Sequence, residues 1–379
     1  MRLRYGILIG VALLNLAGYQ SVQAQKFNPT KVPAAITPLI KYARELGDPE
    51  KATLKSFIGP QIQRIMTAKS GAEIQDAKSL LLNPINHPLV GLYFYQAYIE
   101  ITLNEISGVD LARASDMVKV NVLIMLAELK TPLSLGLASK SLDDPNIAVR
   151  YWAAKTISMM VRKGEDLSQK LGNHEQEDTL KKLSEVVAKE KSAYGRLALY
   201  EAFNVLTISE ARLGLLDALK NAAGYYVKDN GGNIEPNINT GIEAELAAIK
   251  MVQQKMLIQY AEGKVEPDEI KLLAVVVARY LSLLTMVIQN DSLDPALYPQ
   301  AMSHIEDSQR AFQFAAKEFP PAPEAVPQWA TKLKLKDKDG FMLEVFDWLG
   351  SGGREGFLST SGMKVPLKDL QVKPIEAAE

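Results

Sequence analysis

The chain has 379 residues, of which 47% are hydrophobic and 23% are charged, a globular composition that excludes a disordered or wholly membrane-embedded protein. The formal net charge of −1 at pH 7 gives no electrostatic reason to expect nucleic acid or anionic lipid as a partner. Cysteine is absent, which excludes disulfides, thiolate metal sites, a cysteine nucleophile and a lipid-bearing cysteine.

The first 24 residues have the pattern of a secretory signal peptide. Arg2 and Arg4 precede an apolar run over residues 7–17, and residues 22–24 (VQA) suit signal peptidase. The alternative, an uncleaved membrane anchor, is disfavoured because the run is about half the ~20 residues that span a bilayer. We therefore expect a mature chain beginning at Gln25, exported to a bacterial periplasm or the cell exterior, with no membrane insertion after cleavage.

Short helices followed by a longer one are expected over residues 25–107. Thr37-Pro38 and Asp48-Pro49 each place a capping side chain before a proline, an arrangement that favours a helix start. Residues 60–82 indicate two further helical pieces that are separated at Ser70-Gly71. Apolar side chains at helical spacing predict a long helix over residues 92–103.

The clearest motif is LDDPNIAVRYWAAKTI, residues 142–157. Asp144 is a good N-cap and Pro145 suits the first helical position, so a helix is predicted to begin there. Steps of three and four residues place Val149, Ala153 and Ile157 on its buried face. The small residues on this face allow a neighbouring helix to approach closely.

This segment resembles the second half of a HEAT-type helical repeat, in which Leu-Asp, a tight turn, Val-Arg and paired alanines follow one another. In such repeats the arginine, here Arg150, usually pairs with turn aspartates, so the resemblance favours a structural role for it over a binding role. Poorer copies lie at residues 117–129, with Lys119, and at residues 194–206, with Arg196. The resemblance implies an all-α fold, a right-handed α-α superhelix of stacked helix pairs, and a scaffold role.

The segment KDNGGNIEPNINTG, residues 228–241, is the clearest internal break. Its acidic and amide side chains could hold calcium, but their spacing does not match an EF-hand loop, so an exposed connection is favoured. The expected organisation is a signal peptide (1–24), a repeat array (25–228), a helical group continuing the array (242–319), and a proline-rich linker with a short irregular tail (320–379).

Residues 272–288 are the most hydrophobic stretch beyond the signal peptide. A transmembrane helix is disfavoured because Arg279 lies at the centre of this stretch, where a charge in the bilayer costs free energy. Arg279, Ser282, Thr285 and Gln289 fall on one helical stripe. The pattern therefore predicts a buried helix with one hydrated edge.

The tail is rich in aromatic residues, which a free tail would not usually carry. We expect it to fold back as a strap over the last helices, with docking on another protein as the alternative. The aromatic residues are Trp329, Phe341, Phe346, Trp348 and Phe357.

Residues for catalysis are scarce. His87, His174 and His304 are far apart and show no metal-ligand spacing, and phosphate-loop, dinucleotide-binding and serine-nucleophile motifs are absent from the sequence. His87 is expected in a turn and His304 on a solvated helix face. No catalytic, cofactor-binding or metal-binding residue is predicted.

Two functional hypotheses remain. The first is a non-enzymatic exported scaffold whose second repeat helices bind a protein or peptide partner, or which forms a structural part of a larger surface assembly. The second is a polysaccharide-active hydrolase or lyase of the cell envelope on an α/α scaffold. For the first hypothesis, the candidate partner-binding residues are Asn121, Tyr151, Lys155, Tyr200 and Asn204. The alternative is that these residues are ordinary exposed positions on helices.

Overall fold

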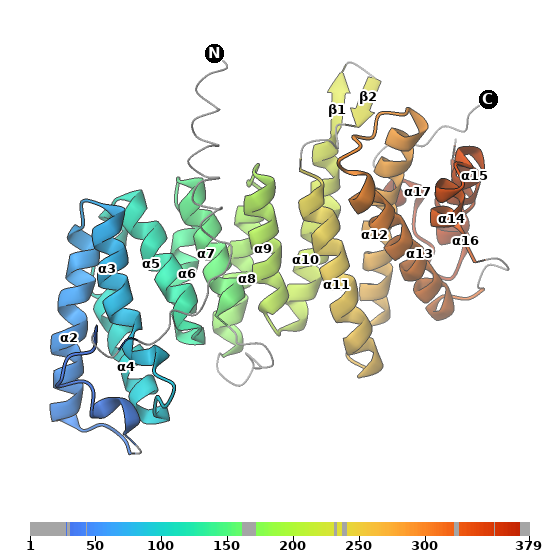
Figure 1. The fold of residues 1–379 in the computed structure, drawn as a ribbon. Coiled ribbons are helices and arrows are strands. Elements are labelled where there is room, and N and C mark those ends of the chain that lie inside the picture. Colours follow the sequence, from blue (N-terminus) through green and yellow to red (C-terminus); the bar gives the residue numbers. More distant parts are fainter. Residues whose placement is uncertain are drawn as a thin grey trace, which may run out of the picture. The chain divides into compact units, whose positions relative to one another are not determined.

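The computed structural model describes residues 28, 31–42, 44–160, 172–230, 233–236, 241–321, 326–351 and 353–371. The described chain is all-α apart from one small β-hairpin (Figure 1). It divides into two compact units, residues 1–131 and 132–379, so the main division does not fall at residues 228–241. The expected signal peptide lies outside the described residues.

The first unit is a group of packed helices. Its elements are η2 (Leu39–Lys41), α2 (Asp48–Thr67), α3 (Gly71–Leu82), η3 (Pro84–Asn86), α4 (Leu92–Ser107), η4 (Leu111–Arg113) and α5 (Asp116–Leu129). Helix α2 packs against α3 and α4, and α3 packs against α5. The first helical piece expected from residue 60 is part of a longer helix, because α2 begins at Asp48 and continues through Pro60. Pro60 is on the exposed side of the helix, where water can reach the carbonyl that proline leaves without a donor.

The second unit stacks its helices in two layers. Its main helices are α6 (Leu135–Lys140), α7 (Ile147–Met159), α8 (Asn173–Val187), α9 (Ala193–Val205), α10 (Ser209–Ala222), α11 (Glu243–Ala261), α12 (Pro267–Gln289) and α13 (Tyr298–Glu318), with short turns η5 (Pro132–Ser134), η6 (Ser141–Asp143) and η8 (Ala223–Tyr226). One layer runs α7, α9, α11, α13 and the other α6, α8, α10, α12, each helix packing against the next in its layer. Successive helix pairs therefore bury each other's apolar faces.

Helix α7 begins later than the motif predicts. Asp144 does not cap it; Asn146 does, because its side chain accepts a hydrogen bond from the Ala148 amide at 2.8 Å. The Asp144 carboxylate instead accepts from the Asn146 amide at 2.9 Å, which keeps Pro145 in the turn. The predicted core face is confirmed, since Val149, Ala153, Ala154, Thr156 and Ile157 are buried.

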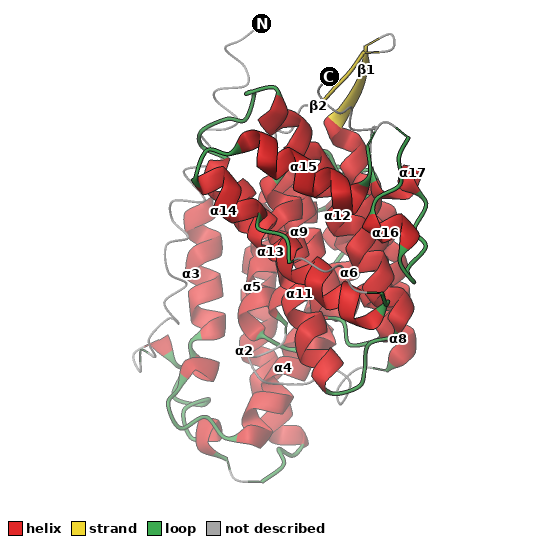
Figure 2. Cartoon of the chain, turned by 90° about the vertical axis from the view of Figure 1, so that its right-hand side faces the viewer, coloured by secondary structure: helices red, strands yellow, loops and turns green. Residues whose placement is uncertain are grey.

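The expected loop between α10 and α11 contains an antiparallel hairpin. Strand β1 (Val227–Asn230) pairs with β2 (Asn233–Pro236), with Val227 opposite Pro236 and Asn230 opposite Asn233 (Figure 2). Residues 231–232 and 237–240 lie outside the described part, as do the side chains on which the calcium alternative depends.

Helix α12 is the buried centre of the second unit. Among the described helices it alone has the length and composition to cross a membrane, but 78% of its most apolar window is buried in the protein. The predicted hydrated edge is wrong for Ser282 and Thr285, which are wholly buried. Their hydroxyls donate to the carbonyls of Arg279 and Leu281 in their own helix, so no water is needed to satisfy them.

The tail packs on the same chain as a strap, defined here as residues 326–371. It contains α14 (Trp329–Lys334), α15 (Lys338–Leu349), α16 (Phe357–Thr360) and α17 (Leu367–Leu370), so the expected irregular tail is in fact helical (Figure 2). Trp329 and Trp348 pack on Phe312 of α13 with ring centroids 5.6 Å apart in each case. The strap covers the face where a further helix pair would stack.

Candidate functional site

Ion pairs connect successive helices of each layer, and seven of them share one direction, whereas Lys182 of α8 pairs with Asp143 of η6 in the opposite direction. A basic side chain on the earlier helix meets a carboxylate on the later helix or on the turn that leads into it. We call this set the ion-pair ladder. In the second unit it consists of Arg150–Glu190, Lys155–Glu201, Arg196–Glu245, Arg212–Glu269 and Lys250–Asp307. Lys55–Glu105 and Lys78–Glu128 follow the same direction in the first unit.

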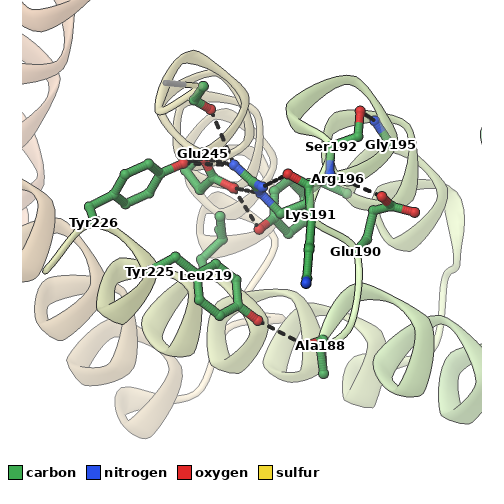
Figure 3. A network of polar contacts seen from close by, with 12 residues as sticks. Ala188, Glu190, Lys191, Ser192, Gly195, Arg196, Leu219, Tyr225, Tyr226 and Glu245 are labelled. Carbon is green, nitrogen blue, oxygen red and sulfur yellow. Dashed lines mark hydrogen bonds and ion pairs between the residues drawn. The ribbon is translucent and has the colours of Figure 1, made fainter. Parts of the chain in front are cut away.

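The most buried pair of the ladder joins α9 to α11. The Glu245 carboxylate is fully buried, and the Arg196 Nε atom lies 2.5 Å from its Oε1 atom. The Tyr200 hydroxyl donates to the same oxygen at 3.0 Å, and the Tyr226 hydroxyl donates to the other oxygen. Figure 3 shows Arg196 of α9 and Tyr226 of η8 pointing toward Glu245 of α11. The buried charge is thus both paired and hydrogen-bonded.

The two tyrosines of this network are kept neutral, and Arg196 is kept charged. Burial raises the pKa of Tyr226, and the adjacent Glu245 carboxylate raises it further. Burial and the same carboxylate also raise the pKa of Tyr200. Burial lowers the pKa of Arg196, but its hydrogen bond and charge attraction to Glu245 outweigh this and raise the pKa overall. Both tyrosines therefore remain hydrogen-bond donors at neutral pH, and the site is suited to holding helices together.

The network also connects the segments that lead into and out of the hairpin. The Arg196 Nη2 atom donates to the Tyr226 hydroxyl at 2.8 Å and to the Gly241 carbonyl at 3.4 Å, groups that precede and follow the hairpin. Gly241 has φ of +99°, and a Cβ atom there would lie 2.7 Å from the Ala193 Cβ atom. Glycine is therefore required at this position.

Arg150 has the structural role that the motif resemblance implies, but with different partners. Its Nη1 atom donates to the backbone carbonyls of Asp144 and Pro145 at 3.0 Å each, rather than to the aspartate side chains of its own turn. Its Nη2 atom lies 2.8 Å from the buried carboxylate of Glu190. Glu190 in turn accepts from the Ser192 amide at 3.0 Å, which ties the turn before α9 to α7.

The five predicted partner-binding residues do not form one site. Asn121 lies on α5 in the first unit, where its side-chain amide donates to the Met117 carbonyl at 2.8 Å. Tyr151 and Lys155 on α7 and Asn204 on α9 are partly exposed in the second unit. The prediction that Tyr200 lies on the surface is wrong, because Tyr200 is 0% exposed and its hydroxyl donates a hydrogen bond to Glu245.

Two exposed apolar residues that the sequence analysis missed lie on the same two helices as the surviving candidates of the second unit. Ile147 and Tyr194, at the starts of the neighbouring helices α7 and α9, are 46% and 69% exposed. Helical spacing places Ile147 on the same side of α7 as Tyr151 and Lys155, and Tyr194 on the same side of α9 as Glu201. The Lys155–Glu201 ion pair joins these two sides and has no net charge. We call this surface the α7–α9 face: Ile147, Tyr151, Lys155, Tyr194, Leu197 and Glu201. Its signal in the sequence was a large apolar residue at the first or second position of each helix.

The histidines do not form a site. In its predicted turn, His87 accepts from the Leu89 amide at 2.9 Å through its Nδ1 atom. The expected solvated position of His304 is wrong, since this residue is 3% exposed and packs edge-on to Tyr280. Burial lowers the pKa of His304 to about 4, so its ring is neutral at physiological pH. In the described ranges, no cluster of three histidine or acidic side chains could hold a metal ion.

No known protein family, curated protein or solved structure matches this chain. The resemblance to HEAT repeats rests on the motif residues and stays a prediction.

Proposed function

We propose that the protein is a non-enzymatic, exported helical-repeat scaffold that binds a protein or peptide partner through the α7–α9 face. The observation that carries the proposal is the exposure of Ile147 and Tyr194 on the neighbouring helices α7 and α9. Exposed aromatic and apolar side chains that lie together on an otherwise polar surface are typical of binding sites. The adjacent Lys155–Glu201 pair leaves little net charge, which suits a largely apolar partner surface.

The ion-pair ladder supports this proposal because it holds α7 and α9 in place before a partner arrives. Arg150–Glu190 and Lys155–Glu201 both connect these helices near the exposed residues. A surface that is fixed in advance loses less conformational entropy on binding. In the proposed stacking of repeats as a superhelix, these second helices would line the binding surface, and the signal-peptide pattern places the scaffold in the periplasm or outside the cell.

The test is an affinity capture from the producing cell's envelope extract with the mature chain, residues 25–379, as bait. A variant carrying Ile147→Ser and Tyr194→Ser removes the exposed apolar groups, and the matched control carries Leu89→Ser and Leu92→Ser, exposed residues of the first unit. We expect a specific protein to be retained by the parent chain and the control and lost with the α7–α9 variant. Equal retention by all three chains, or none by a folded parent chain, would contradict the proposal.

A further inference from the structure

One side of α11 is exposed along most of the length of the helix. The other sides of α11 pack against α9, α10, α12 and α13. The exposed residues recur at steps of three and four, which places them on one stripe of the helix surface. We call this stripe the α11 face: Ala247, Lys250, Gln254, Leu257, Ile258 and Ala261.

The C-terminal half of the α11 face is apolar. Leu257 and Ile258 are adjacent in the chain and are 54% and 66% exposed. The aromatic residue that follows them, Tyr260, is instead held against α13, because its ring packs edge-on to Phe314 at 4.7 Å and its hydroxyl donates to Glu318. Large apolar side chains that stay together in solvent on a long helix indicate an interaction surface.

Opposite charges lie on either side of these apolar side chains. Lys250 precedes them and Glu262 follows them, and both side chains are about half exposed. The Lys250 Nζ atom lies 3.9 Å from the Asp307 Oδ2 atom, and Asp307 also pairs with Arg310. Glu262 pairs with its neighbour Lys264 on the surface at 2.9 Å. Exposed pairs of this kind contribute little to stability, so both charges can take a further partner.

This arrangement is complementary to itself. When a second α11 is laid antiparallel on the α11 face, with a two-fold axis near Met256, Lys250 of each copy comes opposite Glu262 of the other. Leu257 and Ile258 of both copies then meet beside the axis. The contact has an apolar centre between two ion pairs, which is the usual organisation of an interface between identical chains.

We propose that the α11 face binds a second copy of this chain and that the two α11 helices pack antiparallel in a symmetric dimer. Such a dimer is closed, because each copy uses the same surface. The formal net charge of −1 opposes the association of two copies only weakly. The α11 face is on a different helix from the α7–α9 face, so the dimer does not depend on the binding function proposed for that face.

Sedimentation velocity of the mature chain, residues 25–379, measures the dimer between ~1 and ~300 μM, and we expect a reversible dimer with a dissociation constant in this range. A variant carrying Leu257→Gln and Ile258→Gln should associate at least ~10-fold more weakly, because the apolar centre is lost. The matched control carries Ile147→Ser and Tyr194→Ser, which remove exposed apolar groups from the α7–α9 face, and should form the dimer as the parent chain does.

Two charge reversals test the antiparallel register. Lys250→Glu and Glu262→Lys each place like charges opposite each other, so each variant alone should associate at least ~10-fold more weakly than the parent chain. An equal mixture of the two variants restores both ion pairs across the interface, and we expect it to form a mixed dimer. The loss of the contact between Lys250 and Asp307 cannot explain this recovery, because that contact stays broken in the mixture.

Circular dichroism checks that each variant has the helix content of the parent chain. The proposal is overturned if the parent chain stays monomeric throughout the concentration range, if the Leu257→Gln and Ile258→Gln variant dimerises like the parent, or if the α7–α9 control loses the dimer. It is also overturned if the mixture of the two charge-reversal variants associates no more tightly than either variant alone.

Discussion

Two joints of the second unit, α9–α11 and α12–strap, differ in how they pair an arginine side chain. At the α9–α11 joint, Arg196 has a buried carboxylate and two tyrosine hydroxyls converge on the same group. At the α12–strap joint, Arg279 has one long hydrogen bond to a backbone carbonyl. Arg196 is fully paired and Arg279 is not, so we call the first joint closed and the second joint open at its arginine. Beside its apolar packing, the strap is still connected by ion pairs to α13 and to the turn after α12, through Lys334–Glu306 and Lys338–Asp291.

The largest effect on stability should come from removing the negative charge of Glu245 at the α9–α11 joint. Glu245→Gln leaves the Arg196 guanidinium buried without a counter-charge, and we expect the free energy of unfolding to fall by about 3–5 kcal/mol. Urea denaturation followed by circular dichroism measures the change. Glu243→Gln, an exposed position of the same helix, is the control and should change stability by less than ~0.5 kcal/mol. A loss below ~1 kcal/mol for Glu245→Gln would show that the joint is not electrostatic.

A second effect of similar size should appear as a pH dependence of the free energy of unfolding, which arises from His304 at the α12–α13 contact. Burial lowers the pKa of His304 to about 4 from 6.5, so the unfolded chain binds its proton more readily. The contribution of neutral His304 to the free energy of unfolding is therefore fully present above pH 6.5. It is lost as the pH falls towards 4, and the total loss is about 3 kcal/mol.

His304→Asn keeps a side-chain donor and removes the titrating group. Denaturation midpoints measured between pH 7 and pH 4 should fall less steeply for this variant than for the parent chain, since the titration of His304 no longer contributes to the slope. Parallel pH profiles for the two chains would contradict the burial of a neutral histidine.

The hydroxyl groups of the closed joint should contribute less than its charges. Tyr200→Phe removes a hydrogen bond to the buried Glu245 carboxylate, and we expect a loss of about 1.5–3 kcal/mol in unfolding free energy. The exposed Tyr194→Phe provides the matched control, with no measurable change. If the two variants lose equal stability, the Tyr200 hydroxyl is not a necessary part of the network.

The smallest predicted effect concerns the start of α7. Asn146→Ala removes the observed N-cap and should cost about 1 kcal/mol. A hydrogen-exchange measurement of residues 147–150 should show faster exchange in the variant. Unchanged protection would favour the helix start at Asp144 that the sequence pattern predicts.

The sequence predicts local features of this fold better than its long-range contacts. The core face of α7 follows from apolar spacing, and the aromatic tail folds back as a strap as its composition predicts. Glu245 pairs with Arg196 across 49 residues, and no local pattern distinguishes this acid from an exposed helical one. Tyr200 and His304 look like surface residues because their polar atoms suggest hydration. Both are instead held in the core by packing and hydrogen bonds that only the fold brings together.

The most direct test of the closed and open joints compares two identical changes, Arg196→Met and Arg279→Met, by urea denaturation at pH 7. We expect Arg196→Met to cost about 3–5 kcal/mol, because Glu245 is left buried and unpaired, and Arg279→Met to change stability by less than ~1 kcal/mol. Similar losses for the two variants would contradict the account, since Arg279 would then be as fully paired as Arg196.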